Sequence, residues 1–292
     1  MSGEIGLLWL VDADPPSEAP GGRGFYPANG RTDPPDERVM VERLNTAARL
    51  IAAEAGGRAV VTIHTSPRHR EHLFAEPYAG IWQGLRDAGT DLALHPHEER
   101  LDGRTHYGNL AHMRGVVEET MEAGRRIGID FTVFRSGGFA FHDALPALLA
   151  QAGIRLDCSA APGHVDASRD IAWPDREEIV LDAGEQTIVE VPLGWNGEGT
   201  DLSRDYLFNE RQDLDGLKRV WDAIRQRFDA GLAPPVVNFL THGFGLVAEG
   251  WRDQALRFLD HARRNGARLI SAAEAEAIVL AHWARQQEPT PC

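Results

Sequence analysis

The chain of 292 residues has 44 acidic and 30 basic side chains, a formal net charge of −14, and 42% hydrophobic residues. This is the composition of an ordinary globular protein, and the acidic excess without a basic stripe argues against nucleic-acid or anionic-membrane binding. No apolar run reaches the roughly 18 residues of a membrane span, the N-terminus lacks the basic segment of an export signal, and the two cysteines form no disulfide framework. We therefore expect a cytoplasmic protein.

The first predicted element is a buried strand that runs into two aspartates. Residues 5–11 are a short run of mostly large apolar side chains, closed by Asp14 and two prolines, which favours a strand over a helix. Because side chains alternate along a strand, Asp12 and Asp14 point to the same side, about 6–7 Å apart along the backbone. Two buried carboxylates this close are unfavourable unless they share a cation or a proton. The pair is a candidate metal or acid–base site.

The rest of the chain mostly alternates helices and strands. Residues 15–35 form a loop rich in proline and glycine, and structureless loops of that length tend to be functional. Apolar periodicity and turn residues predict the other elements. The predicted helices are residues 36–55, 77–88, 110–127, 144–152, 214–228 and 250–265, and the predicted strands are 59–63, 91–94, 131–134, 154–156, 236–240 and 268–270. The alternation is interrupted by a predicted hairpin of residues 178–181 and 187–191, and by a polar loop over residues 194–213.

Alternation over about seven units predicts a parallel sheet with helices outside it. An open doubly wound sheet and a barrel both fit, and a barrel is favoured because six strands end in ionisable or hydrogen-bonding side chains, where the reacting groups of barrels lie. We see no linker, so residues 1–292 are expected to form a single catalytic domain, with loop 15–35 and insert 160–213 shaping the active-site face. The side chains at the predicted strand ends include Asp12, Asp14, His64, His95, His97, Arg135, Asp157 and His242.

The third strand ends in a second candidate motif, His95-Pro96-His97. Alternation again places both imidazoles on one side, and two neutral imidazoles with a carboxylate suit zinc and related divalent ions. The alternative is a turn at Pro96 with two solvated histidines, which the short motif alone favours. When the histidines are considered together with the aspartate pair, a metal site becomes the favoured interpretation. Arg135 could equally cap a strand end, and His242 could be a core histidine.

In this order the motifs resemble those of the NodB-like polysaccharide deacetylases, carbohydrate esterase family 4. Asp12 and Asp14 match the first family motif in the Asp-x-Asp form that a subset of members has. The strand that ends in His95 matches the beginning of the second motif. The position of the second histidine in the common form is occupied by Glu99 here. Some relatives have His-x-His-Pro instead, and by comparison with them His97 is the replacement in this chain.

The later motifs continue the resemblance over nearly the whole chain. Arg135 and the small-residue turn after it resemble the third motif, residues 155–159 around Asp157 the fourth, and Leu240-Thr241-His242 the fifth. The resemblance implies a distorted (β/α)7 barrel, with parallel strands inside and helices outside.

The implied activity is metal-dependent removal of an N-acetyl group from an amino sugar or a related small acetylated metabolite. Asp14, His95 and His97 would hold a divalent ion, for which we expect zinc. The ion would activate a water molecule whose proton Asp12 takes as general base, and His242 would protonate the leaving amine.

Further residues receive supporting roles from the same resemblance. Arg135 would orient Asp12, and Asp157 would orient Arg135 or His242. The substrate is expected to be a small molecule or an oligosaccharide that carries the N-acetyl group. Two aromatic residues in predicted loops offer stacking surfaces for a sugar ring, or ordinary loop packing: Tyr26 and Trp195.

Two other functions stay open from the sequence. The first is a metal-independent hydrolase of a ring amide, of the ureide type, on the same barrel, which the altered second motif would fit. The second is a barrel that binds a glycan or small ligand without turnover. The presence of both Asp12 and His242 argues against pure binding, which needs neither a base nor an acid. The oligomeric state is open.

Overall fold

The computed structural model describes residues 3–16, 32–100, 102, 104–175, 177, 180–182 and 186–287. The strands are β1 (Ile5–Ala13), β2 (Val60–His64), β3 (Asp91–His95), β4 (Val133–Phe134), β5 (Leu156–Asp157), β6 (Val165–Asp166), β7 (Ile171–Ala172), β8 (Val180–Asp182), β9 (Thr187–Glu190), β10 (Val236–His242) and β11 (Ala267–Leu269). The helices are α1 (Glu37–Ala55), α2 (Tyr78–Asp87), α3 (Leu110–Arg126), α4 (Leu145–Gln151), α5 (Leu214–Asp229), α6 (Gly243–Val247), α7 (Glu249–Arg264) and α8 (Ala272–Gln287).

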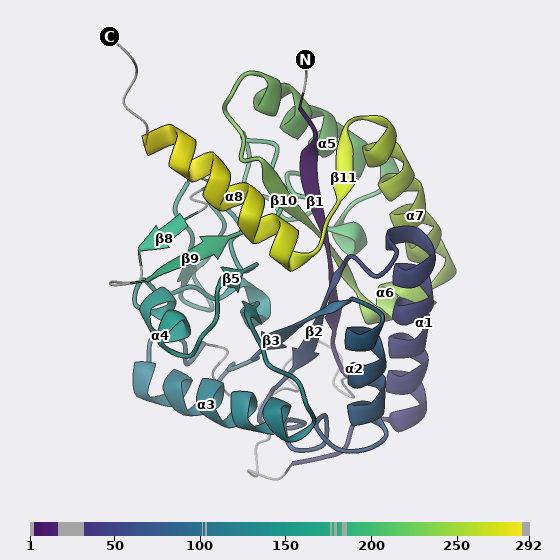
Figure 1. The fold of residues 1–292 in the computed structure, drawn as a ribbon, viewed down its shortest axis with the longest axis vertical. Helices are drawn as coiled ribbons and strands as arrows, with labels where there is room; N and C mark the ends of the chain where they lie inside the picture. The colour runs from purple at the N-terminus through teal and green to yellow at the C-terminus, as the bar shows by residue number, and fades with distance from the viewer. Residues whose placement is uncertain are drawn as a thin grey trace.

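The centre of the molecule is a curled, mostly parallel sheet with the helices around its outside (Figure 1). Its strands follow the order β10-β1-β2-β3-β4-β5-β9-β8, and β8 pairs with β9 in the antiparallel sense. Beyond β9, isolated parallel bridges from Leu193 to Asn238 and from Phe208 to Leu240 lead back to β10. The predicted α/β fold with a parallel sheet of the distorted-barrel type is confirmed, as is the hairpin now formed by β8 and β9.

Strand β1 is held by three neighbours. It pairs in parallel with β10, β2 and β11, and each of its nine residues is buried. A strand that is covered on both faces has apolar side chains at successive positions, which explains the uninterrupted apolar run of residues 5–11. The register places Asp12 opposite His242 of β10, and His64 of β2 opposite His95 of β3. The carboxyl ends of these strands therefore meet at one edge of the sheet.

Helix α8 was absent from the predicted elements. Its buried residues are two alanines and one valine, so its apolar stripe is weak. A stronger signal lies at its start, where Ser271 Oγ accepts a hydrogen bond from the Glu274 N–H (3.2 Å) and the Glu274 carboxylate accepts one from the Ser271 N–H (2.9 Å). This reciprocal pair is a capping box, which the Ser-x-x-Glu spacing announces.

Three of the sequence predictions concern residues that the structure does not describe. Residues 17–31 of loop 15–35, and Tyr26 with them, lie outside it, as does Cys292. Cys158 is buried and has a free thiol. Among the helices that the structure describes, none combines the length and apolar character needed to cross a bilayer.

Candidate metal centre

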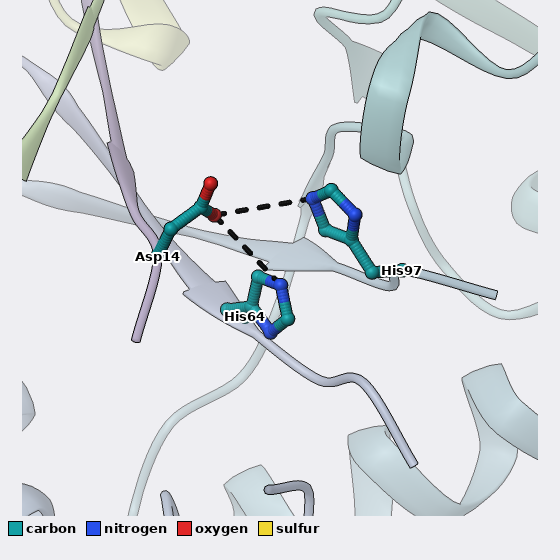
Figure 2. A group of neighbouring side chains, drawn as sticks. All are labelled: Asp14, His64 and His97. Atoms are coloured by element: carbon teal, nitrogen blue, oxygen red, sulfur yellow. Dashed lines mark ion pairs between the residues drawn. The ribbon is translucent and has the colours of Figure 1, made fainter. Parts of the chain in front are cut away.

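Three strand ends bring Asp14, His64 and His97 together at the carboxyl edge of the sheet (Figure 2). Asp14 follows β1, His64 ends β2, and His97 lies two residues beyond β3. Asp14 Oδ1 is 3.8 Å from His64 Nε2 and 3.9 Å from His97 Nε2. One possible ligand atom from each residue lies within 4.8 Å of the other two. His64 was recognised in the sequence only as a strand end and was not predicted as a ligand.

His95, which the sequence predicts as a ligand, faces the same oxygen. Its Nε2 lies 3.6 Å from Asp14 Oδ1 and 3.1 Å from His97 Nε2, so the predicted set of Asp14, His95 and His97 is also assembled. A tetrahedral zinc with bonds of about 2.0–2.1 Å places its ligand atoms about 3.3 Å from one another. Asp14 Oδ1 is buried and has no hydrogen-bond partner among the described residues. The donor set therefore fits a divalent cation.

Second partners of the imidazoles fix which nitrogens face the centre. His95 Nδ1 donates to the Arg135 carbonyl oxygen (2.8 Å), and His97 Nδ1 donates to Glu99 Oε1 (2.6 Å). The Nε2 lone pairs of His95 and neutral His97 therefore face each other, which is unfavourable unless a proton or a metal ion lies between them. Glu99 thus accepts a hydrogen bond from the His97 nitrogen that points away from the centre, an arrangement that commonly orients metal-binding histidines.

The pKa shifts follow from the same contacts. Burial alone would raise the pKa of Asp14, but His95, His64 and His97 hold it well below its ordinary value. Burial would lower the pKa of His97, and the Glu99 carboxylate raises it above the ordinary value instead. The centre therefore pairs a carboxylate with at least one imidazole that readily takes a positive charge.

His64 differs from the other two imidazoles. Its Nδ1 accepts a hydrogen bond from the Ser66 N–H (3.3 Å), which leaves the proton of the neutral ring on Nε2. Its ring is stacked on that of His97, with centroids 4.3 Å apart, and burial holds its pKa well below the ordinary value. His64 would bind a metal through Nε2 only after this proton has moved.

The turn after β4 packs directly against His97. A Cβ at Gly137 would lie 2.6 Å from His97 Cγ and 2.6 Å from the Pro96 carbonyl oxygen. We expect Gly137→Ala to displace the His97 ring and to weaken metal binding by about 10-fold or more, since even indirect support of a ligand is typically worth about 10–100-fold. A competition titration with a chromophoric chelator measures this. Gly115→Ala on α3, where nothing lies within 4 Å, is the matched control, and equal affinities of the two variants would contradict the expectation.

Asp12 lies behind the centre and is only 2% exposed. Its Oδ2 is 3.2 Å from Arg135 Nη2 and 3.8 Å from His95 Nε2, whereas its Oδ1 has no hydrogen-bond partner among the described residues. The Arg135 guanidinium lies over the Phe139 ring, 4.4 Å from its centroid, and Phe139 has a left-handed backbone (φ 59°). Such strain at a non-glycine residue is typical of functional sites. The predicted contact between Arg135 and Asp12 is present.

Asp157 lies near Arg135 and pairs with a second carboxyl group. Its Oδ1 accepts hydrogen bonds from the Ser159 N–H (2.9 Å) and from the Ser159 hydroxyl. Burial raises the pKa of Asp157 to about 6 and that of Glu190 beside it well above the ordinary value, so the pair shares a proton. Asp157 makes no contact with His242 in the part of the chain that the structure describes. Nor is it within ion-pair distance of Arg135 among the described residues, although the Arg135 charge lowers the pKa of Asp157, so the orienting role of Asp157 stays a prediction.

His242 has a different acidic partner, Glu210. Glu210 Oε1 accepts the His242 backbone N–H (2.9 Å), and Oε2 lies 3.2 Å from the ring Nδ1. The Nε2 atom on the other side of the ring is 3.9 Å from Asp14 Oδ2. The ring contacts those of Phe208 and Phe244, with centroids 5.4 Å and 5.0 Å away. Burial lowers the pKa of His242, but Glu210 raises it above the ordinary value. Glu210 was not predicted, because it lies in the polar loop 194–213.

Trp195 is not placed to stack on a substrate at this centre. Its side chain is buried, and the Arg227 guanidinium covers its ring at 5.2 Å from the centroid. It lines a separate cavity of about 530 Å³ together with Arg227 and residues 231–234, which precede β10. That cavity lies at the amino end of β10, and His242 is at the other end.

Comparison with known proteins gives a likeness of structure only. No family model matches the sequence, and no curated protein matches it. A protein of Mycobacterium smegmatis named a polysaccharide deacetylase superposes with a TM-score of 0.64 at 13% identity, over 100% of this chain and 94% of the other. One of the same name from Pseudomonas aeruginosa PAO1 gives 0.58 at 12% identity, over 99% and 94%.

The same fold also occurs with another activity. An exo-type maltose-forming amylase of Pyrococcus sp. ST04 superposes with a TM-score of 0.58 at 11% identity, over 98% of this chain and 50% of the amylase. Fold likeness at such identities carries no activity with it. The chain thus has the curled, mostly parallel α/β fold found in proteins named polysaccharide deacetylases, with an Asp–His cluster at the carboxyl edge of its sheet.

Proposed function

We propose that the protein is a metal-dependent hydrolase that removes an N-acetyl group from an amino sugar or a related small acetylated compound. One observation carries the proposal: a buried carboxylate oxygen of Asp14 without a hydrogen-bond partner faces the Nε2 atoms of three histidines. A second carboxylate, Asp12, and a fourth imidazole, His242, lie beside this cluster. A ligand-binding barrel without turnover needs neither of these two groups.

The cation would be held by Asp14, His95 and His97, with His64 as a further nitrogen donor. Imidazole and carboxylate ligands suit zinc among the divalent ions. When bound, a divalent cation polarises the acetyl carbonyl and lowers the pKa of water at the site.

The remaining chemistry belongs to side chains of the protein. Asp12 accepts the proton of the attacking water through Oδ1, while Arg135 holds the other oxygen of this carboxylate in place. His242 donates a proton from Nε2 to the amine nitrogen as the C–N bond breaks, since an unprotonated amine is a poor leaving group. Glu210 at Nδ1 keeps the ring in the orientation that this transfer requires.

One paired experiment tests the proposal. The metal content of the purified protein is measured, and acetate release is followed over a panel of N-acetylated sugars before and after chelation. We expect bound metal, activity that chelation abolishes, and recovery on adding zinc. Asp12→Asn should lower acetate release by roughly 10²–10⁴-fold with the metal content kept. Acetate release that persists without metal would favour a metal-independent deacetylase, whereas opening of a ring amide by the metal-free protein, without acetate release, would favour the ring-amide hydrolase. Ligand binding without any turnover would favour a binding barrel.

A further inference from the structure

A cation on α1 lies beside the candidate metal centre. Arg43 Nη1 donates a hydrogen bond to the backbone carbonyl oxygen of Asp14 (2.8 Å). The stem of Arg43 packs against Gly243, the residue after His242, with its Cβ 3.5 Å from the position of a Cβ built there. The guanidinium carbon is 5.8 Å from the centroid of the Phe244 ring, which itself contacts His242. Arg43 is thus wedged between the strand ends that carry the proposed ligand and the proposed acid.

Among the described residues, this guanidinium has no carboxylate within ion-pair distance, although the nearby Asp14 charge acts on it through space. Arg43 is half-buried, and its Nε atom is buried without a hydrogen-bond partner in the part of the chain that the structure describes. Partly or fully buried arginines elsewhere are paired, as Arg135 is with Asp12 and Arg227 is with Glu177. Burial also lowers the pKa of Arg43, as expected for a charge removed from water without a full counter-charge.

An unpaired, partly buried cation is unfavourable in a chain that has 44 acidic side chains to offer. We propose that Arg43 binds an anionic group of the substrate, so that the substrate is an N-acetylated compound carrying a carboxylate or a phosphate. This rests on the proposed function and names its substrate class. Because the Asp14 carbonyl holds Nη1 and Nε is buried, Nη2 is the nitrogen left to donate hydrogen bonds to the oxygens of such a group.

The geometry also gives the anionic group a fixed position. Arg43 is anchored to the backbone of the residue whose side chain is the proposed metal ligand. An anion bound to its free edge would therefore hold the substrate at a set distance from the site where the acetyl group reacts. The divalent ion would also attract an anion, so the contribution of Arg43 is the part of the preference that is lost when Arg43 is replaced.

Binding of matched probes tests this by calorimetry on the metal-loaded protein with Asp12→Asn as the background, which keeps the metal and slows hydrolysis of the probes. The probes are N-acetylglucosamine, which is uncharged, N-acetylmuramate, which adds a carboxylate, and N-acetylglucosamine 6-phosphate. We expect one of the anionic probes to bind about 10–100-fold more tightly than the uncharged one. Arg43→Gln should bring this ratio close to one, and Arg43→Lys, which keeps the charge without the planar edge, should give an intermediate ratio. Which anion is preferred distinguishes the carboxylate from the phosphate.

Arg38→Gln, which removes an exposed charge from the same helix, is the control and should leave the ratio unchanged. The proposal is overturned if neither anionic probe binds more tightly than the uncharged one, or if the preference survives Arg43→Gln. If Arg43→Gln fails to fold, the ratio measured for Arg43→Lys decides. Since binding is read without turnover, an Arg43-dependent preference without acetate release would reject the hydrolase and keep the anion site. Acetate release without any anion preference would keep the hydrolase and reject the anion site.

Discussion

Replacing Asp14 by asparagine is expected to lower metal affinity by more than about 100-fold, because even groups that merely support a ligand are typically worth about 10–100-fold. Acetate release should fall at least as far. Asparagine keeps the shape of the side chain but removes the charge, so the Nε2 atoms of the surrounding histidines would face a neutral amide. Metal content after dialysis, together with acetate release at saturating zinc, measures both effects.

The controls for this replacement lie elsewhere in the same chain. Asp130→Asn changes an exposed carboxylate that follows α3 and should leave metal content and activity unchanged. His95→Ala should resemble Asp14→Asn, whereas His64→Ala should keep more affinity, since the His64 Nδ1 accepts rather than donates its hydrogen bond. Wild-type metal content and full activity in Asp14→Asn would show the metal assignment to be wrong.

The second large effect is expected at His242. His242→Ala should lower kcat by roughly 10²–10⁴-fold, the usual contribution of a general acid, with KM changed by only a few-fold. The physical reason is that the amine then departs without a proton. Steady-state kinetics at one pH separate the two parameters. A change in KM with kcat unaltered would reject the role as acid, because it would show a group that only binds the substrate.

The pH dependence of the reaction gives a finer test of the same residue. Glu210 raises the pKa of His242 above its ordinary value of 6.5, so the ring stays protonated to higher pH. A general acid must be protonated, and activity should therefore fall as the pH rises through this raised pKa. Glu210→Gln removes the negative charge, lowers the pKa, and should move this alkaline limb to lower pH. The exposed Glu118→Gln is the control, and an unmoved limb in Glu210→Gln would contradict the assignment.

The aspartate pair shows what local periodicity predicts well. Alternation along β1 placed Asp12 and Asp14 on one side of the strand, and in the structure both reach His95 Nε2, at 3.8 Å and 3.6 Å. Parallel strands in register then bring their carboxyl ends together, as the pairing of Asp12 with His242 shows. Both inferences use only the two-residue period of a strand and the common direction of the strands. The fold class and most of the cluster follow from them.

The residues that were missed depend on contacts distant in sequence. A single histidine at the end of β2 has no spacing to distinguish it, and His64 joins the cluster only because it is in register with His95. Glu210 lies in a polar stretch without periodicity, and reaches His242 because the nearby Phe208 bridges to Leu240 of β10. Loops of this kind are positioned by the scaffold around them, so their own sequence does not specify what they touch.

The three neighbours of β1 have a consequence for how such a protein can be altered. The strand that carries Asp12 and leads into Asp14 pairs with three other strands, and its residues are all buried. A substitution in this strand is therefore expected to lower both the folding stability and the catalytic activity. The anion preference proposed for Arg43 is less coupled to this strand, because Arg43 lies on α1, outside the sheet. A redesign of substrate specificity should therefore begin with residues outside the strand, such as Arg43, and leave β1 unchanged.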